Sequence, residues 1–200
     1  MHLRQLYSRE PGPNDEIYVV QTGDFIQRTA SRFNVSQELL LRINNISDPR
    51  LLAVGHRIKV PKMNFELEVD KSANTLTVRA NGEFFKRYRV RTGRFDYMTP
   101  TGDYKIIHKK VDPDWRKPGS GELIPAGDPR NELGTRWMAF QGSSLGIHGT
   151  IDPSTIGYYS SQGCVGLLKE DVEELYEYIP VGTPLRIRGE QNPALRLDGA

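Results

Sequence analysis

The chain has 200 residues, of which 37% are hydrophobic and 26% charged, a composition typical of a folded, water-soluble protein. Lys and Arg total 27 against 25 Asp and Glu, and the resulting net charge of +2 argues against a nucleic-acid partner. No apolar run approaches the roughly 20 residues of a membrane span, and the N-terminus lacks the apolar segment of a secretory signal, so we expect any export or anchor segment to be absent from this chain. The single cysteine, Cys164, excludes an intramolecular disulfide and a cysteine-based zinc cluster, and we expect no metal or organic cofactor.

The N-terminal quarter predicts a small βααβ unit. Residues 1–16 contain prolines and glycine without hydrophobic periodicity, and we expect them to form a tail. A short apolar strand over 17–20 precedes two stretches with helical spacing, over 26–33 and 36–44, and a closing strand near 58–61. The candidate N-caps of the two helices are Asp24 and Ser36.

Four segments of this unit, residues 18–24, 29–35, 40–44 and 55–61, resemble a LysM module, which we delimit as 17–61. The resemblance implies binding of glycans that contain N-acetylglucosamine, such as peptidoglycan strands. The alternative is a small packing domain without a ligand, because function follows from sites rather than folds. The residues expected to contact the glycan are Gly23, Asp24, Phe25, Ile26, Ile46, Leu51 and Leu52.

The remainder alternates apolar and polar residues, which is typical of β-strands. Asn81-Gly82 predicts a tight hairpin, because both positions accept positive φ. One apolar stripe, Val172, Leu175, Tyr176 and Ile179, predicts a single helix. Residues 109–134 contain several glycines and prolines and are too long for a simple connection in a compact domain, and we interpret them as a lid-like loop. The expected strands lie at 65–69, 76–78, 84–90, 102–108, 136–141 and 184–188, before a loose tail at 189–200.

Cys164 is the only side chain of its kind, and a thiol that attacks an amide needs a base beside it. His2 falls in the tail, His56 in the LysM-like module, and His108 among lysines at a strand end. His148 remains, sixteen positions before the cysteine, which suits a strand, a loop and a return. The alternative is a buried histidine beside a buried cysteine with no catalytic role.

Residues 98–104, 131–138, 147–150 and 161–165 together resemble the L,D-transpeptidase (YkuD) catalytic domain, which would extend over 64–188. The resemblance implies a mostly β fold, with Cys164 as nucleophile and His148 as general base and later acid. It also implies that the carbonyl of Gly149 orients His148, and that N–H groups of Gly163 and Cys164 stabilise the oxyanion. The expected substrate contacts are Ser161, Gln162, Thr150, Arg136 and Trp137.

Two positions depart from the family pattern. The family often has His where this chain has Gln162, and commonly Arg where it has Gly166. Because an arginine fork suits a substrate carboxylate, its loss bears on specificity and activity. The candidates for supplying the charge from elsewhere are Arg136, Arg94 and Arg130.

We therefore expect an α+β protein, a βααβ LysM module followed by a mostly β catalytic domain with one helix. The expected function is L,D-transpeptidation of peptidoglycan stem peptides in the bacterial cell wall or periplasm, with LysM targeting and with acylation of Cys164 by carbapenems. The alternatives are a catalytically impaired wall-binding protein, an L,D-carboxypeptidase-type cysteine hydrolase, and a structural component of the envelope or coat.

Overall fold

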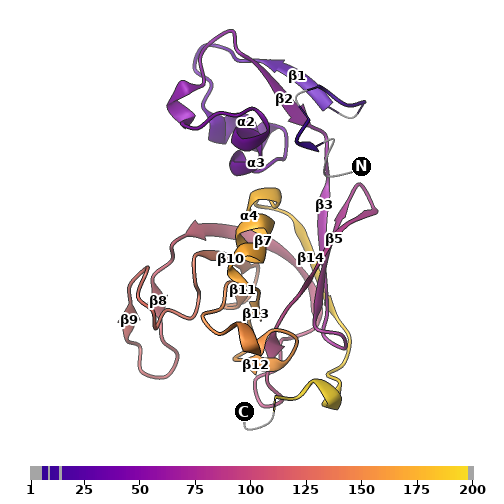
Figure 1. Cartoon of the computed structure of the whole chain (residues 1–200), viewed down its shortest axis with the longest axis vertical. Coiled ribbons are helices and arrows are strands. Elements are labelled where there is room, and N and C mark those ends of the chain that lie inside the picture. The colour runs from indigo at the N-terminus through magenta and orange to yellow at the C-terminus, as the bar shows by residue number, and fades with distance from the viewer. Residues whose placement is uncertain (1–5, 9, 14, 198–200) are drawn as a thin grey trace.

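The computed structural model describes residues 6–8, 10–13 and 15–197. A small N-terminal module lies at one end, and the rest of the chain forms a curled β-sheet with a helix against it (Figure 1). No helix among the described residues is long and apolar enough to cross a bilayer.

The N-terminal module has the predicted order β, α, α, β. Its strands pair antiparallel, with Asp15 opposite Pro61 and Val19 opposite Arg57. Seven side chains from the two helices, the closing strand and the connecting segments form a separate small core, among them Ile26, Leu40 and Val60. The elements are β1 (Asp15–Val19), α2 (Ile26–Arg32), α3 (Gln37–Ile43), the 3-10 turn η1 (Pro49–Leu51) and β2 (Arg57–Pro61).

One of the two predicted helix caps is confirmed. Ser36 caps α3, where its hydroxyl oxygen accepts a hydrogen bond from Leu39 N–H at 3.0 Å. The prediction for Asp24 is wrong, because α2 begins one residue later, with Phe25 as an N-cap that makes no side-chain bond. The Asp24 carboxylate instead accepts hydrogen bonds from the Tyr18 hydroxyl at 2.6 Å and Gln21 N–H at 2.7 Å. Asp24 therefore closes the turn before the helix rather than capping it.

The larger domain is built on one eight-stranded sheet that confirms the predicted strands. The chain after β5 reaches the opposite edge of the sheet, where Arg91 forms an isolated bridge with Gly166. The pairs β11–β13 and β14–β3 are parallel and the others antiparallel. In spatial order the strands are β13 (Val165–Gly166), β11 (Gly146–His148), β10 (Arg136–Phe140), β7 (Gly102–Val111), β14 (Pro184–Arg188), β3 (Phe65–Asp70), β4 (Thr75–Ala80) and β5 (Glu83–Arg89).

Turn chemistry fixes one connection of the sheet, and a second connection is more ordered than expected. Asn81 and Gly82 have φ angles of 53° and 79°, which confirms the tight hairpin between β4 and β5. The segment interpreted as a loop over 109–134 is more ordered than expected, because β7 continues to Val111. It then forms a small hairpin of β8 (Trp115–Arg116) and β9 (Leu123–Ile124) that projects from the domain (Figure 1). A second small sheet pairs β6 (Thr92–Gly93) with β12 (Tyr159–Ser161).

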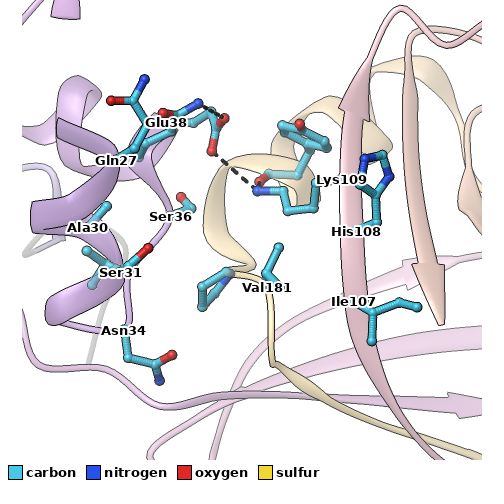
Figure 2. A pocket seen from close by; sticks show the side chains of 14 residues that line it. Gln27, Ala30, Ser31, Asn34, Ser36, Glu38, Ile107, His108, Lys109 and Val181 are labelled. Atoms are coloured by element: carbon cyan, nitrogen blue, oxygen red, sulfur yellow. Dashed lines mark hydrogen bonds and ion pairs between the residues drawn. The ribbon is translucent and has the colours of Figure 1, made fainter. Parts of the chain in front are cut away.

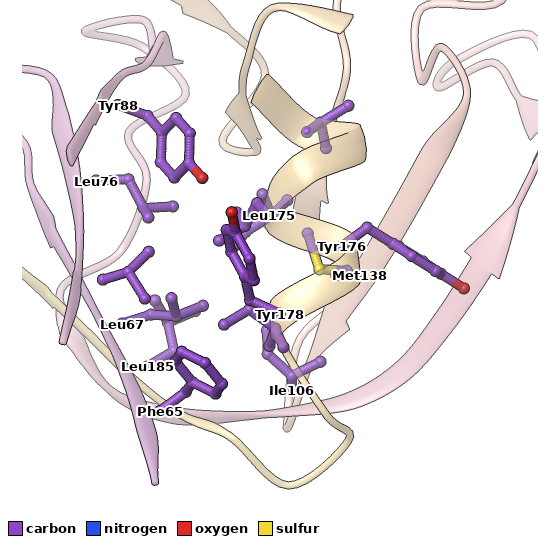
Figure 3. Packing of buried hydrophobic residues seen from close by; sticks show 14 of the residues in the cluster. Phe65, Leu67, Leu76, Tyr88, Ile106, Met138, Leu175, Tyr176, Tyr178 and Leu185 are labelled. Carbon is purple, nitrogen blue, oxygen red and sulfur yellow. The ribbon is translucent and has the colours of Figure 1, made fainter. Parts of the chain in front are cut away.

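The predicted helix is α4 (Lys169–Tyr178), and it packs on the inner face of the sheet. Figure 3 shows Leu175 and Tyr178 of this helix directed at strand residues such as Leu67, Leu76 and Ile106. These side chains are at most 2% exposed, so their burial supplies the main driving force for folding of this domain.

The two domains share a continuous core. Leu39 and Ile43 of α3 belong to the same buried cluster as α4. Around them, Arg42 pairs with Glu177, and the Ser36 hydroxyl donates to the Glu177 carbonyl. A groove of about 440 Å³ lies beside this contact, between the module and β7, and the ion pair of Glu38 with Lys109 spans it at 3.3 Å (Figure 2).

Both expected tails pack against the fold in their described parts. Leu6 is fully buried in the shared core, and the ammonium group of Lys59 donates to the carbonyls of Leu6 and Ser8. At the other end, Gln191 donates to the carbonyl of Gly93, and a 3-10 turn η3 (Pro193–Leu195) follows. Neither contact could be predicted from local patterns, because the partners of both segments lie far away along the chain.

Candidate active site

Parallel strands β11 and β13 bring the two expected catalytic residues to one face of the sheet. Ile147 is opposite Val165, and His148 is opposite Gly166. Side chains alternate between the faces of a strand, so Cys164, directly before β13, lies on the same face as His148. Ile147 and Val165 point the other way, into the core under α4. The site therefore lies on the face of the sheet edge that the helix does not cover.

His148 is buried and its ring is held in one orientation. Nδ1 lies 2.5 Å from the carbonyl oxygen of Gly149. Because a carbonyl can only accept, Nδ1 carries the proton in the neutral ring, and Nε2 is the nitrogen with the lone pair. The Gly149 N–H donates to the carbonyl of Leu133 at 2.9 Å, which anchors this turn to the end of the long 109–134 segment.

An indole ring covers one side of the site. Trp137 is the register partner of His148, and their rings stack with centroids 5.9 Å apart. The indole lies across Gly146, where a Cβ would come within 2.5 Å of the ring. Gly146 is thus required for the close approach of the indole to the strand, a contact that the sequence analysis did not anticipate.

Hydrogen bonds within the loop fix the backbone around Cys164. The Ser161 hydroxyl donates to the carbonyl of Cys164 at 2.6 Å and accepts from Gly163 N–H at 3.2 Å. Gly163 has a φ of 103°, a conformation that favours glycine. Ser161 was expected to contact substrate, whereas its hydroxyl here positions the cysteine. The N–H of Gly163, expected to bind the oxyanion, is directed at Ser161 in the free protein.

Burial sets the protonation states of the pair. It lowers the pKa of His148 to about 3, with the positive charge of Arg91 acting in the same direction, while the carbonyls of Gly149 and Glu132 oppose the change. Burial also raises the pKa of the Cys164 thiol, against the N–H of Gly146 and the charge of Arg91. The resting pair at neutral pH is therefore a thiol and a neutral imidazole, not an ion pair.

An arginine that the sequence analysis did not single out lies in this site. Arg91 is 6% exposed, and its backbone exchanges two hydrogen bonds of 2.9 Å with Gly166. A Cβ on Gly166 would lie 2.5 Å from Nε of Arg91 and 2.7 Å from its Cγ, so the arginine side chain fills the space that a side chain at 166 would occupy. The only signal for this in the sequence was Gly166, because a glycine at that position leaves space for the side chain of another residue.

The side chains of the three arginines suggested as replacements lie close to other acidic groups. Arg136 faces α4, where it lies over the Tyr176 ring and 3.8 Å from Glu173. Arg94 lies beside the cysteine loop, where its N–H donates to the carbonyl of Ser161 at 2.9 Å, but its side chain is 3.3 Å from Asp96. Arg130 pairs with Asp128 and Glu122 on the surface. The structure therefore does not bring Arg136 to the cysteine as the substrate-contact prediction required.

The remaining expected substrate contacts differ in accessibility. Gln162 is exposed beside the cysteine, where it can meet a ligand. Thr150 is 7% exposed and its hydroxyl bonds within the next turn, to the backbone of Asp152. Among the residues that the structure describes, no cluster of three or more His, Cys, Asp or Glu side chains could hold a metal ion.

The expected glycan contacts surround the turn before α2 and the segment around η1. Phe25 and Leu51 are 61% and 58% exposed, so the ring and the aliphatic side chain are both accessible for packing against a sugar. Gly23 is exposed, and Ile46 and Leu52 are half-buried. Ile26, in contrast, is 1% exposed and belongs to the core of the module, so its side chain faces away from any ligand.

Comparison with known proteins agrees with this arrangement. Residues 64–187, more than half of the chain, match the family model of the YkuD L,D-transpeptidase catalytic domain. The chain belongs to this family. Residues 18–61 match the LysM domain, so a LysM domain precedes the L,D-transpeptidase domain.

Curated relatives and solved structures carry the same family name. The putative L,D-transpeptidase YkuD of Bacillus subtilis is 31% identical over 85% of this chain and 97% of its own length. The putative L,D-transpeptidase YqjB of the same organism is 36% identical over 60% of this chain and 68% of its own length. L,D-transpeptidase 3 of Mycobacterium tuberculosis, solved with a faropenem-derived adduct, has a TM-score of 0.54 over 68% of this chain and 66% of that one. At 22% identity, that likeness concerns the fold alone.

Proposed function

We propose that this L,D-transpeptidase transfers the acyl group of a peptidoglycan tetrapeptide stem through a thioester on Cys164. The sulfur attacks the carbonyl of the third stem residue while Nε2 of His148 takes the thiol proton. The tetrahedral adduct collapses to a thioester, and the terminal D-alanine leaves as an amine protonated by His148. An amine of a second stem, or of a free D-amino acid, then attacks the thioester and releases the thiol.

One observation supports this proposal above the others. His148 is held through Nδ1 by the carbonyl of Gly149, on the strand that pairs with the cysteine strand. Because neither the thiolate nor the imidazolium is favoured at rest, the thiol proton passes to His148 only during the reaction. The oxyanion that forms requires N–H donors, and the backbone amides of Gly163 and Cys164 are nearest along the chain. In this role the Gly163 N–H would exchange its hydrogen bond to the Ser161 hydroxyl for one to the oxyanion.

The chemistry is tested with a purified disaccharide-tetrapeptide and mass spectrometry. The parent protein should give crosslinked dimers, or exchanged stems when a D-amino acid is added. Cys164→Ala should give neither, and His148→Gln should be slowed by at least about 100-fold, the typical contribution of general base catalysis. If free tripeptide is the sole product, water rather than an amine attacks the thioester, and the protein is a hydrolase rather than a transferase.

A carbapenem provides a second readout that needs no acceptor. The parent protein should gain the mass of the drug, and Cys164→Ala should not. A parent protein that neither gains this mass nor turns over muropeptides, yet still binds peptidoglycan, would be a wall-binding protein without catalysis.

We further propose that the LysM domain holds the enzyme on glycan strands of the cell envelope, which raises the effective concentration of stems at Cys164. The exposed ring of Phe25 and the exposed aliphatic side chain of Leu51 support this proposal. Replacing both with serine in the full chain should abolish sedimentation with insoluble peptidoglycan. The control Phe84→Ser removes an equally exposed side chain, 59% exposed, from β5 of the catalytic domain, and should leave sedimentation unchanged.

A further inference from the structure

Arg91 is a buried cation that forms no salt bridge with the residues that the structure describes. Its side chain makes no hydrogen bond or salt bridge with any residue that the structure describes, and its Nε is buried and unpaired. Burying an unpaired charge is costly, and such residues persist where the charge serves a function. The absence of a permanent counter-ion suggests that the anion it serves forms only during the reaction.

The position of Arg91 identifies that anion. Arg91 and Gly166 are opposed in an antiparallel bridge, so their side-chain positions share one face of the sheet. Cys164 and His148 lie on that same face, by alternation along β13 and by register with β11. The guanidinium covers Gly166, two residues from the sulfur.

We propose that Arg91 is a positioning residue of this active site, whose buried guanidinium, lodged over Gly166, is the counter-charge for the sulfur anion that forms at Cys164. The proposal rests on the proposed role of Cys164 as nucleophile. The same charge disfavours protonation of His148, so the imidazole stays available as a base.

The other ionisable groups around Arg91 are acids at the surface. Glu132 precedes β10 and Asp152 follows β11, and both interact with Arg91 electrostatically without forming a salt bridge to it. Burial lowers the pKa of Arg91, and the charges of Glu132, Cys164 and Asp152 oppose that change. Of these three groups, Glu132 and Asp152 are exposed to solvent, whereas the Cys164 sulfur acts on Arg91 from within the site.

Alkylation of Cys164 by iodoacetamide tests the proposal without any transpeptidase substrate. In Arg91→Met, which keeps the apolar stem and removes the charge, the thiol pKa should rise, and alkylation at pH 7 should slow about tenfold per pH unit of that rise. The pKa of His148, followed by NMR of the labelled imidazole, should rise as well. A merely structural defect has a different signature, because opening the site to water lowers the thiol pKa while it raises that of His148.

Two further variants serve as control and rescue. Arg89→Met removes a charge from an exposed arginine, two residues earlier, whose guanidinium lies over Gly157 in a similar way, and should leave the alkylation profile unchanged. Arg91→Ala combined with Gly166→Arg returns a guanidinium to the same space from the other strand. The backbone of Gly166 is outside the left-handed region, so an arginine is tolerated there once that of residue 91 is removed. The double variant should recover most of the rate lost in Arg91→Ala.

The alkylation profile and muropeptide turnover separate the two proposals. An unchanged or lowered thiol pKa in Arg91→Met would overturn the role of Arg91, whatever the turnover. A raised thiol pKa with rescue by the double variant would support it, even in a protein that forms no crosslinks. A rise in KM for the acyl donor with an unaltered thiol pKa would mean that Arg91 binds substrate instead, which also overturns the proposal.

Discussion

The buried neutral imidazole of His148 should make the stability of the protein depend on pH. In the unfolded chain a histidine has a pKa near 6.5, whereas burial lowers the pKa of His148 to about 3 in the folded protein. Its folded pKa is depressed, so between these values the unfolded chain binds a proton that the native state excludes. Stability is therefore complete above about pH 6.5 and declines as the pH falls toward 3.

The magnitude follows from the same two values. A pH of 5 lies about 1.5 units below the pKa of the unfolded histidine. At about 1.36 kcal/mol per unit, the free energy of unfolding is therefore about 2 kcal/mol lower at pH 5 than at pH 7. His148→Gln removes this term, because glutamine does not titrate. Urea unfolding followed by tryptophan fluorescence at pH 7 and pH 5 should therefore show a drop in the free energy of unfolding that is about 2 kcal/mol smaller in the variant.

The difference between variant and parent isolates this residue from the carboxylates that also titrate. The control His108→Gln removes an exposed histidine from β7, and its drop should match that of the parent. Equal drops in His148→Gln and the parent would refute the conclusion that His148 is buried in its neutral form.

Two matched pairs of variants test the loop around the cysteine and the contact between domains. Ser161→Ala leaves two backbone groups of the cysteine loop unpaired and should lower the free energy of unfolding by about 2 kcal/mol. Its control, Ser160→Ala, removes a buried hydroxyl for which the structure shows no hydrogen-bond partner, and should change the free energy of unfolding by less than about 0.5 kcal/mol. Equal effects in urea titrations would contradict the loop hydrogen bonds. Lys109→Met deprives Glu38 of its partner across the domain contact and should lower the free energy of unfolding, measured by thermal unfolding, by about 2 kcal/mol. Its control, Lys110→Met, removes an exposed ion pair and should lower it by less than about 0.5 kcal/mol. A loss in Lys109→Met as small as that in the control would mean that this ion pair does not stabilise the contact between the domains.

The features that the sequence predicted are those with local causes. The Asn81-Gly82 hairpin follows from two positive φ angles, and the cap at Ser36 follows from one side chain and the next turn of helix. The helix α4 follows from an apolar stripe with a period of 3.6 residues. Each depends on neighbours within a few positions, so a pattern in the sequence is sufficient to predict it.

The features that the sequence missed depend on distant partners. Leu6 lies in a stretch without periodicity, yet it is buried because the core shared by α3 and α4 has room for it. Arg91 looks like any strand-end arginine, and only its bridge to Gly166, 75 positions later, places it in the site. Asp24 shows the converse, since a pattern typical of a cap was overridden by hydrogen bonds to Tyr18 and Gln21.

The shared core also bears on how the two domains would work together. A flexible tether would let the catalytic domain sample any stem within its reach, with an effective concentration that falls as the linker lengthens. Here Leu39 and Ile43 of α3 pack in the same cluster as α4, and Lys109 pairs with Glu38 across the contact. Moving the LysM domain would expose these side chains, at about 25 cal/mol for each Å² of apolar surface. We therefore expect a glycan strand held at Phe25 and Leu51 to present stems to Cys164 at a fixed offset, so that position along the strand contributes to the choice of stem.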